Sequence, residues 1–149
     1  MNDSNKSHLH GIQLQQVVVT ELSMKLSRPV EESSEFAIHI ATGHSEYDRE
    51  TREIQVSLSL TMHSESEGEE ADPAMTGRVS LFGIFTVDER DFPVEQLPSW
   101  ARSNAPALLY PYLREHVYGL SMRCGIRNVF LPLIVVPTFV AERVKCSGE

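Results

Sequence analysis

Residue types that would point to metal, nucleotide or redox chemistry are scarce in this 149-residue chain. Its two cysteines, Cys124 and Cys146, lie far apart and form no CxxC pair, so we expect neither a disulfide framework nor a zinc site. The six histidines show no HExxH spacing, and no P-loop for nucleotide phosphates occurs. No nucleophile–base motif and no pair of carboxylates in an apolar setting is found. We therefore expect no metal, no cofactor and no enzymatic activity.

Long apolar runs and an excess of basic charge are also missing. No run approaches the roughly 20 residues that a membrane-spanning helix needs, and the N-terminal MNDSNKSHLHG lacks the apolar stretch of a secretory signal. The chain has 13 basic and 21 acidic residues, and its net charge of −8 argues against nucleic acid or an anionic membrane as the partner. We expect a cytoplasmic protein that is not inserted in a membrane and whose partners are apolar or basic.

The length suits a single folded domain. Residues 1–11 are polar, so we expect a flexible N-terminal tail followed by one domain over residues 12–149. Four segments have the composition or alternation of β-strands: residues 12–22, 36–41, 54–62 and roughly 75–87. The third is the clearest, because apolar residues alternate strictly with Gln, Ser and Thr. One of its faces must be covered, whereas the other is free to meet water.

A helical pattern follows a proline-rich connection over residues 88–103. Across residues 106–124, apolar side chains recur three or four apart, as they do along one side of a helix. A run over residues 129–137 is apolar but broken by two prolines, and residues 138–145 fit a short terminal helix. The predicted fold class is therefore α+β, with a four-stranded antiparallel sheet followed by one long helix and one short C-terminal helix.

The long helix supplies the candidate oligomer interface. Its apolar stripe consists of Leu109, Leu113, Val117 and Leu120. One sheet and one helix leave apolar surface in need of cover, and contiguous apolar patches usually mark interfaces or binding grooves. We therefore expect this stripe to pack between subunits.

Two motifs at a characteristic distance resemble the SecB family of export chaperones. The first is Gly83-Ile84-Phe85 in the fourth strand, and the second is the helix start APALLYPYLRE at residues 105–115. An apolar, proline-broken run follows, and the opening strand IQLQ at residues 12–15 also looks like the family's first strand. The resemblance extends over about residues 12–139. It implies a homotetramer, a dimer of dimers, that holds unfolded polypeptides without ATP.

The resemblance also implies where clients would bind. Candidate groove residues carried over from the family are Phe36, Ile38, Ile40, Leu97, Trp100, Phe130, Leu131, Leu133 and Val135. Apolar groove walls would favour any exposed hydrophobic segment, and strand edges accept main-chain hydrogen bonds without reading sequence. Each of these residues equally fits an ordinary core position.

Charges on the outer face of the sheet bear on a second partner. In the family, the ATPase SecA docks on an acidic patch of this face. Of the positions that look equivalent, Glu21 keeps an acid, but Lys25 and Arg78 are basic. Reversed charges weaken such a contact, so the resemblance supports the chaperone scaffold better than engagement of SecA.

Three functions remain open on the sequence alone. The first is a general holdase for unfolded polypeptides or preproteins. The second is a dedicated SecB-like chaperone of a single client, such as an antitoxin. The third, from another class, is an enzyme or a small-ligand binding protein built on an α+β sheet.

Overall fold

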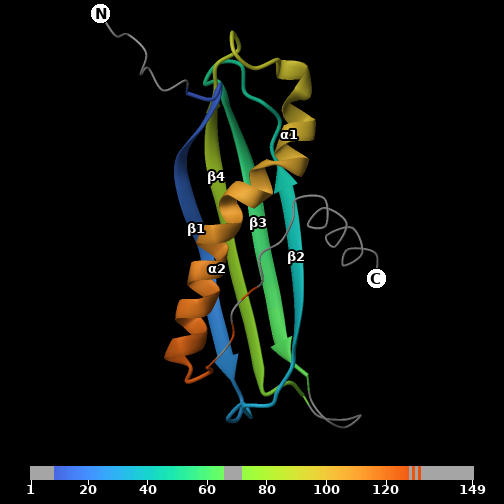
Figure 1. The fold of residues 1–149 in the computed structure, drawn as a ribbon, viewed down its shortest axis with the longest axis vertical. Coiled ribbons are helices and arrows are strands. Elements are labelled where there is room, and N and C mark those ends of the chain that lie inside the picture. Colours follow the sequence, from blue (N-terminus) through green and yellow to red (C-terminus); the bar gives the residue numbers. More distant parts are fainter. Residues whose placement is uncertain (1–8, 66–71, 128, 130, 132–149) are drawn as a thin grey trace, which may run out of the picture.

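A computed structural model describes residues 9–65, 72–127, 129 and 131, and it contains one antiparallel sheet packed against two consecutive helices (Figure 1). The elements are β1 (Ile12–Leu26), β2 (Phe36–His44), β3 (Glu53–Ser64), β4 (Met75–Val87), the short 3-10 helix η1 (Val94–Gln96), α1 (Leu97–Ser103) and α2 (Ala105–Arg123). The sheet order is β1-β4-β3-β2, so the first two strands of the chain form its two edges. The predicted four-stranded sheet and long helix are confirmed, whereas the predicted helix over residues 138–145 lies outside the described residues.

Strand β1 is longer than predicted because two bulges keep its apolar residues on one face. Its pairing with β4 shifts between Leu14 and Gln16 and again between Val19 and Glu21. Each shift places one extra residue in β1, which restores the inward orientation of the apolar positions that follow. The positions facing the helices are Ile12, Leu14, Val17, Val19, Leu22, Met24 and Leu26, as their partners on β4 show.

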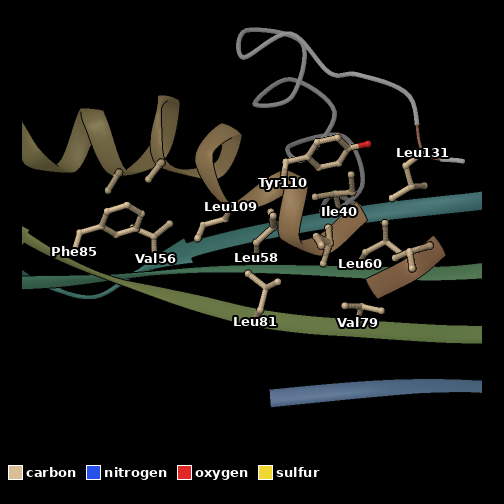
Figure 2. Packing of buried hydrophobic residues seen from close by; sticks show 14 of the residues in the cluster. Ile40, Val56, Leu58, Leu60, Val79, Leu81, Phe85, Leu109, Tyr110 and Leu131 are labelled. Atoms are coloured by element: carbon tan, nitrogen blue, oxygen red, sulfur yellow. The ribbon is translucent and has the colours of Figure 1, made fainter. Parts of the chain in front are cut away.

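The core lies between the sheet and the helices (Figure 2). The alternating apolar residues of β3, from Ile54 to Met62, are all buried, as the strict sequence alternation predicts. Helix α2 contacts β3, β4 and β1, while α1 contacts β2, so the two helices together cross the sheet. Figure 1 shows α2 running diagonally towards the β1 edge.

The two sequence motifs meet in this core. A methyl group on Gly83 would lie 2.7 Å from Cδ2 of Leu109 and 3.0 Å from Cε2 of Phe85. Glycine therefore lets α2 approach the backbone of β4 at this point. The ring of Phe85 also packs edge-to-face on Trp100, with centroids 5.0 Å apart. The residues that carry the family resemblance thus fix how α1 and α2 sit on the sheet.

The proline-rich connection over residues 88–103 contains η1 and α1, two helical elements that the sequence pattern did not predict. Pro98 stands in the first turn of α1, where its missing amide hydrogen removes no helical hydrogen bond. Leu97, Trp100 and Ala101 share the buried side of this helix. Pro98 therefore marks the start of a helix.

Candidate functional site

The candidate sites among the described residues are surfaces of the sheet and of α2. Over residues 9–65, 72–127, 129 and 131, no group of three or more His, Cys, Asp or Glu side chains is placed to hold a metal ion. Within the same residues, no helix is long and apolar enough to cross a membrane. The sites to consider are therefore the apolar and charged surfaces of the sheet and of α2.

The first surface lies along the helix-facing side of β2. Phe36, Ile38 and Ile40 pair with Ser64, Met62 and Leu60 of β3 and share their face of the sheet. Ile40 is buried, whereas Phe36 and Ile38 are only half-buried. The cover provided by the helices therefore thins along β2 from Ile40 towards Phe36. Because β2 is an edge strand, this apolar strip lies beside backbone groups that no neighbouring strand pairs within the described sheet.

The other candidate groove residues do not join this strip as one surface. Leu97 and Trp100 lie on the buried side of α1, where Trp100 packs against Phe85 and Phe92. Leu131 is buried too, and Figure 2 shows it in the same part of the core as Ile40. The three have core positions in this chain, which corrects their assignment to an open groove wall. The remaining candidates, Phe130, Leu133 and Val135, lie outside the described residues.

The predicted oligomer stripe packs inside the subunit. Leu109, Leu113 and Val117 are 0% exposed in a single chain, and Leu120 is half-buried against the same core. A second subunit has no access to side chains that the chain's own sheet already covers. The assignment of the first three to an oligomer interface is therefore wrong.

The opposite side of α2 carries the exposed apolar residues that sequence reasoning missed. They are Leu108, Tyr112, Tyr118 and Met122, and each is between 42% and 51% exposed. Val19, Leu22 and Leu26 on β1, the edge strand that α2 approaches, are also exposed. Helix α2 is apolar on both sides, so its spacing alone does not reveal which side meets the sheet. The signal that helps is Gly83, because its missing side chain selects Leu109 for the buried side.

The outer face of the sheet carries the third surface, and its charges are arranged as predicted. Glu21, Ser23 and Lys25 pair with Ser80, Arg78 and Thr76 of β4, so all six point away from the helices. The Nε of Arg78 lies 3.0 Å from Oε2 of Glu21, and both side chains are substantially exposed. Arg78 thus neutralises Glu21, the acid that remains at this position, while Lys25 adds a positive charge. Little net negative potential is left around Glu21.

A hydrogen-bonded cluster at one end of the sheet braces the loops there. The hydroxyl of Tyr47 donates to Oε1 of Glu89 at 2.7 Å. Burial is the larger cause that raises the pKa of Tyr47, and this hydrogen bond is the second. Arg90 donates to both carboxylate oxygens of Asp88, which lowers the pKa of Asp88. The Tyr47–Glu89 hydrogen bond ties the loop before β3 to the turn after β4, whereas the Asp88–Arg90 pair lies within that turn. We assign neither contact a binding role.

A comparison with protein families finds a match over most of this chain. The family model described as "Preprotein translocase subunit SecB" matches residues 5–141. Proteins named "Protein-export protein SecB" from Cupriavidus taiwanensis and Cupriavidus necator are each 34% identical over 67 residues. That segment is 45% of this chain and 38% of either relative, so the alignment spans well under half of the relatives' length.

The fold has a solved counterpart as well. A SecB-like chaperone of Mycobacterium tuberculosis, solved in complex with a ChAD peptide from the HigA1 antitoxin, superposes with a TM-score of 0.71 at 16% identity. The superposition covers 83% of this chain and 91% of that one. At this level of identity, the similarity establishes the architecture described above.

Proposed function

The chain belongs to the SecB family, and on that premise we propose that it is an ATP-independent holdase chaperone, linked to protein export, that binds unfolded polypeptides. In this proposal it is a cytoplasmic homotetramer, a dimer of dimers, which needs no cofactor and catalyses no reaction. The third possibility, an enzyme or small-ligand binding protein, has no feature of the described residues in its favour.

The observation that carries this proposal is the partly covered apolar strip at the β2 edge. Phe36 and Ile38 are half-buried on β2, whose outer edge is paired with no other strand of the described sheet. An extended client segment placed there would meet apolar side chains and main-chain hydrogen-bonding groups together. Burying about 200 Å² of apolar surface favours binding by about 5 kcal/mol before entropic costs. Neither contribution depends on a particular client sequence.

The test is suppression of aggregation of a chemically denatured, slowly refolding protein at equimolar ratio without ATP. The double substitution Phe36→Ser with Ile38→Ser should weaken suppression and leave the subunit folded. Ala37→Ser with Ala41→Ser is the matched control, because these positions lie on the opposite face of the same strand. Equal suppression by the two double variants would contradict a client site at this edge.

A dedicated chaperone of one client is the second candidate, and the outer-face charges favour it. The Glu21–Arg78 ion pair and Lys25 weaken the case for SecA as a partner. The structural counterpart from M. tuberculosis was solved with an antitoxin peptide, which gives this alternative a concrete form. Identification of proteins co-purified from the native host separates the two: many unfolded precursors support the general holdase, and one small protein supports the dedicated chaperone.

A further inference from the structure

Two histidines lie next to each other on the outer face of the sheet. His39 of β2 pairs with Thr61 of β3, which in turn pairs with the outward-facing Arg78. His63 lies two residues further along β3 and therefore on the same face. The two imidazole rings are inclined by only 18°, and their centroids are 6.4 Å apart. The histidines are 24 residues apart in the chain (63 − 39), so the sequence spacing does not reveal the pair.

We propose that His39 and His63 together bind one divalent ion of a late transition metal, such as Cu²⁺, Ni²⁺ or Zn²⁺. Imidazole nitrogen is a ligand that suits all three ions. At a metal–nitrogen distance of about 2.0–2.1 Å, two imidazoles on one ion have ring centroids about 4.5–6.5 Å apart. The observed separation of 6.4 Å lies in this range. The last torsion of a histidine side chain is soft, so small rotations direct one nitrogen of each ring to a shared ion.

Both rings are accessible to an ion from solvent. His39 is exposed, and His63 is half-buried. Ala37 and Ala41 are the neighbours of His39 on its own strand and face, and their side chains are too short to cover its ring. No third histidine, cysteine or carboxylate is placed to complete a ligand set in the part of the chain that the structure describes. Water would therefore take the remaining coordination positions.

The charged groups around the pair favour a cation on balance. Glu35 and Glu65 continue the β2–β3 ladder by one pair, because the amide of Glu65 donates to the carbonyl of Glu35 at 2.8 Å. By strand alternation, both carboxylates belong to the outer face beside the histidine pair. The cation on the neighbouring strand β4 is Arg78, whose Nε lies 3.0 Å from Oε2 of Glu21 on β1. Its charge is thus directed away from β3, and Lys25 is a further strand away on β1.

A bound ion would join the edge strand β2 to β3 without covering the proposed client strip. Phe36 and Ile38 lie on the helix-facing side of β2, whereas the histidine pair lies on the opposite side. This inference is therefore independent of the proposed holdase function. A ligand that binds only the folded chain stabilises it, so the metal should raise the melting temperature.

The probe is Cu²⁺ alone, because it binds nitrogen ligands most tightly among these ions. Tail histidines and thiols would compete for copper, so the background is the full chain with His8→Gln, His10→Gln, Cys124→Ser and Cys146→Ser. We expect one ion per chain by isothermal titration at neutral pH. The electron paramagnetic resonance spectrum should show splitting from two imidazole nitrogens. His39→Ala and His63→Ala should each weaken binding by about tenfold or more, since each removes half of the protein's ligands.

Two other histidines provide matched controls. His44 points to the helix-facing side of β2, and His116 lies on α2. His44→Ala and His116→Ala should bind copper as the background does. Thr61→His tests the register, because a third imidazole opposite His39 should tighten binding by about tenfold. Ser57→His, four residues away on the same strand and face, should not tighten it.

Three results would overturn the site. Equal copper affinity in the His39→Ala, His63→Ala and control variants would place the ion elsewhere. One ion per two chains would mean that its ligands come from different subunits. Binding that persists at a pH of about 5.5 would assign the ion to carboxylates, because protons displace metals from imidazole as the pH falls. Suppression of aggregation is measured separately on the metal-free chain, so its failure is distinguishable from the failure of the metal site.

Discussion

Gly83 shows how a single residue sets the distance between the sheet and α2. A Cβ there would overlap Leu109 and crowd Phe85, both of which are buried. We expect Gly83→Ala to lower the free energy of unfolding by about 1–3 kcal/mol, because the core has no room for an added methyl group. Urea denaturation monitored by circular dichroism measures the change.

Gly43→Ala is the control for that substitution. The nearest atom to a new Cβ at Gly43 is the hydroxyl oxygen of Ser57, at 3.1 Å, which sits on the sheet's outer face. A strand also tolerates alanine at least as well as glycine. Similar losses of stability in the two variants would mean that the Gly83–Leu109 approach is not a critical contact.

Residue-level prediction from the sequence succeeded where the pattern repeats and failed where it is ambiguous. The buried face of β3 follows from strict alternation. For α2, apolar residues on both sides fit two orientations, and the side chosen for the oligomer interface proved to be the core. Trp100 and Leu97 were predicted as groove residues and lie in the core for a related reason. Large apolar side chains fit a groove wall and an interior equally well until the packing of α1 is known.

Neighbouring positions on α2 should separate folding from assembly. Leu113 is fully buried and Tyr112 is exposed, although they are adjacent in sequence. Leu113→Glu places an unpaired carboxylate in the core, which costs several kcal/mol, so we expect the subunit to unfold. Tyr112→Glu should leave the subunit folded and dissociate the oligomer. Circular dichroism and analytical ultracentrifugation measure the two outcomes, and a folded Leu113→Glu dimer or tetramer would contradict this division.

The bulges of β1 lead to a prediction about deletions. Thr20 is the extra residue between Val19 and Glu21, and its hydroxyl donates to the carbonyl of Ser80. Deleting Thr20 should leave every other residue of β1 on its present face and cost about 1 kcal/mol for the lost hydrogen bond. Deleting Ser23 should move Lys25 to the helix-facing side and lower the melting temperature much further. Equal losses for the two deletions would show that the bulge does not set the register.

At the level of elements, the strands with a regular apolar pattern could be predicted from the sequence. The bulges of β1 and the helix α1, which depart from such a pattern, could not. The four strands were found, and the bounds of β4 agree with the prediction. The bulges were not, because an extra residue in a strand looks like imperfect alternation until the partner strand is known. Helix α1 was missed because Pro98 reads as a loop signal unless it is placed in the first helical turn.

For the molecule as a whole, the outer-face charges predict weak recruitment of SecA. Lys25 and Arg78 stand where the family resemblance implies acids, and Arg78 already holds Glu21 in an ion pair. We expect Lys25→Glu with Arg78→Glu to strengthen SecA binding at least tenfold, or about 1.4 kcal/mol. Isothermal titration at two ionic strengths measures the gain, which should be larger at low salt.

The matched control for that variant makes the same change of net charge away from the outer face of the sheet. The control is Arg49→Glu with Arg90→Glu, because both residues lie in exposed turns outside the sheet. It should leave SecA binding within twofold of the unaltered chain, because charges distant from the contact are screened over about 10 Å. Tight binding by the unaltered chain, lost on Glu21→Lys, would show that one acid suffices.

The sheet order has a consequence for the protein's own biosynthesis. Strand β1 leaves the ribosome first, but its partner β4 ends at Val87, which is 61 residues after Leu26 (87 − 26). At about 5–20 residues per second, β1 waits about 3–12 s for the strand that pairs with it. During that interval the nascent chain presents an unpaired segment rich in valine and leucine. Each newly made subunit therefore passes through a stage in which it exposes an unpaired apolar segment. The clients proposed for the folded chaperone expose segments of the same kind.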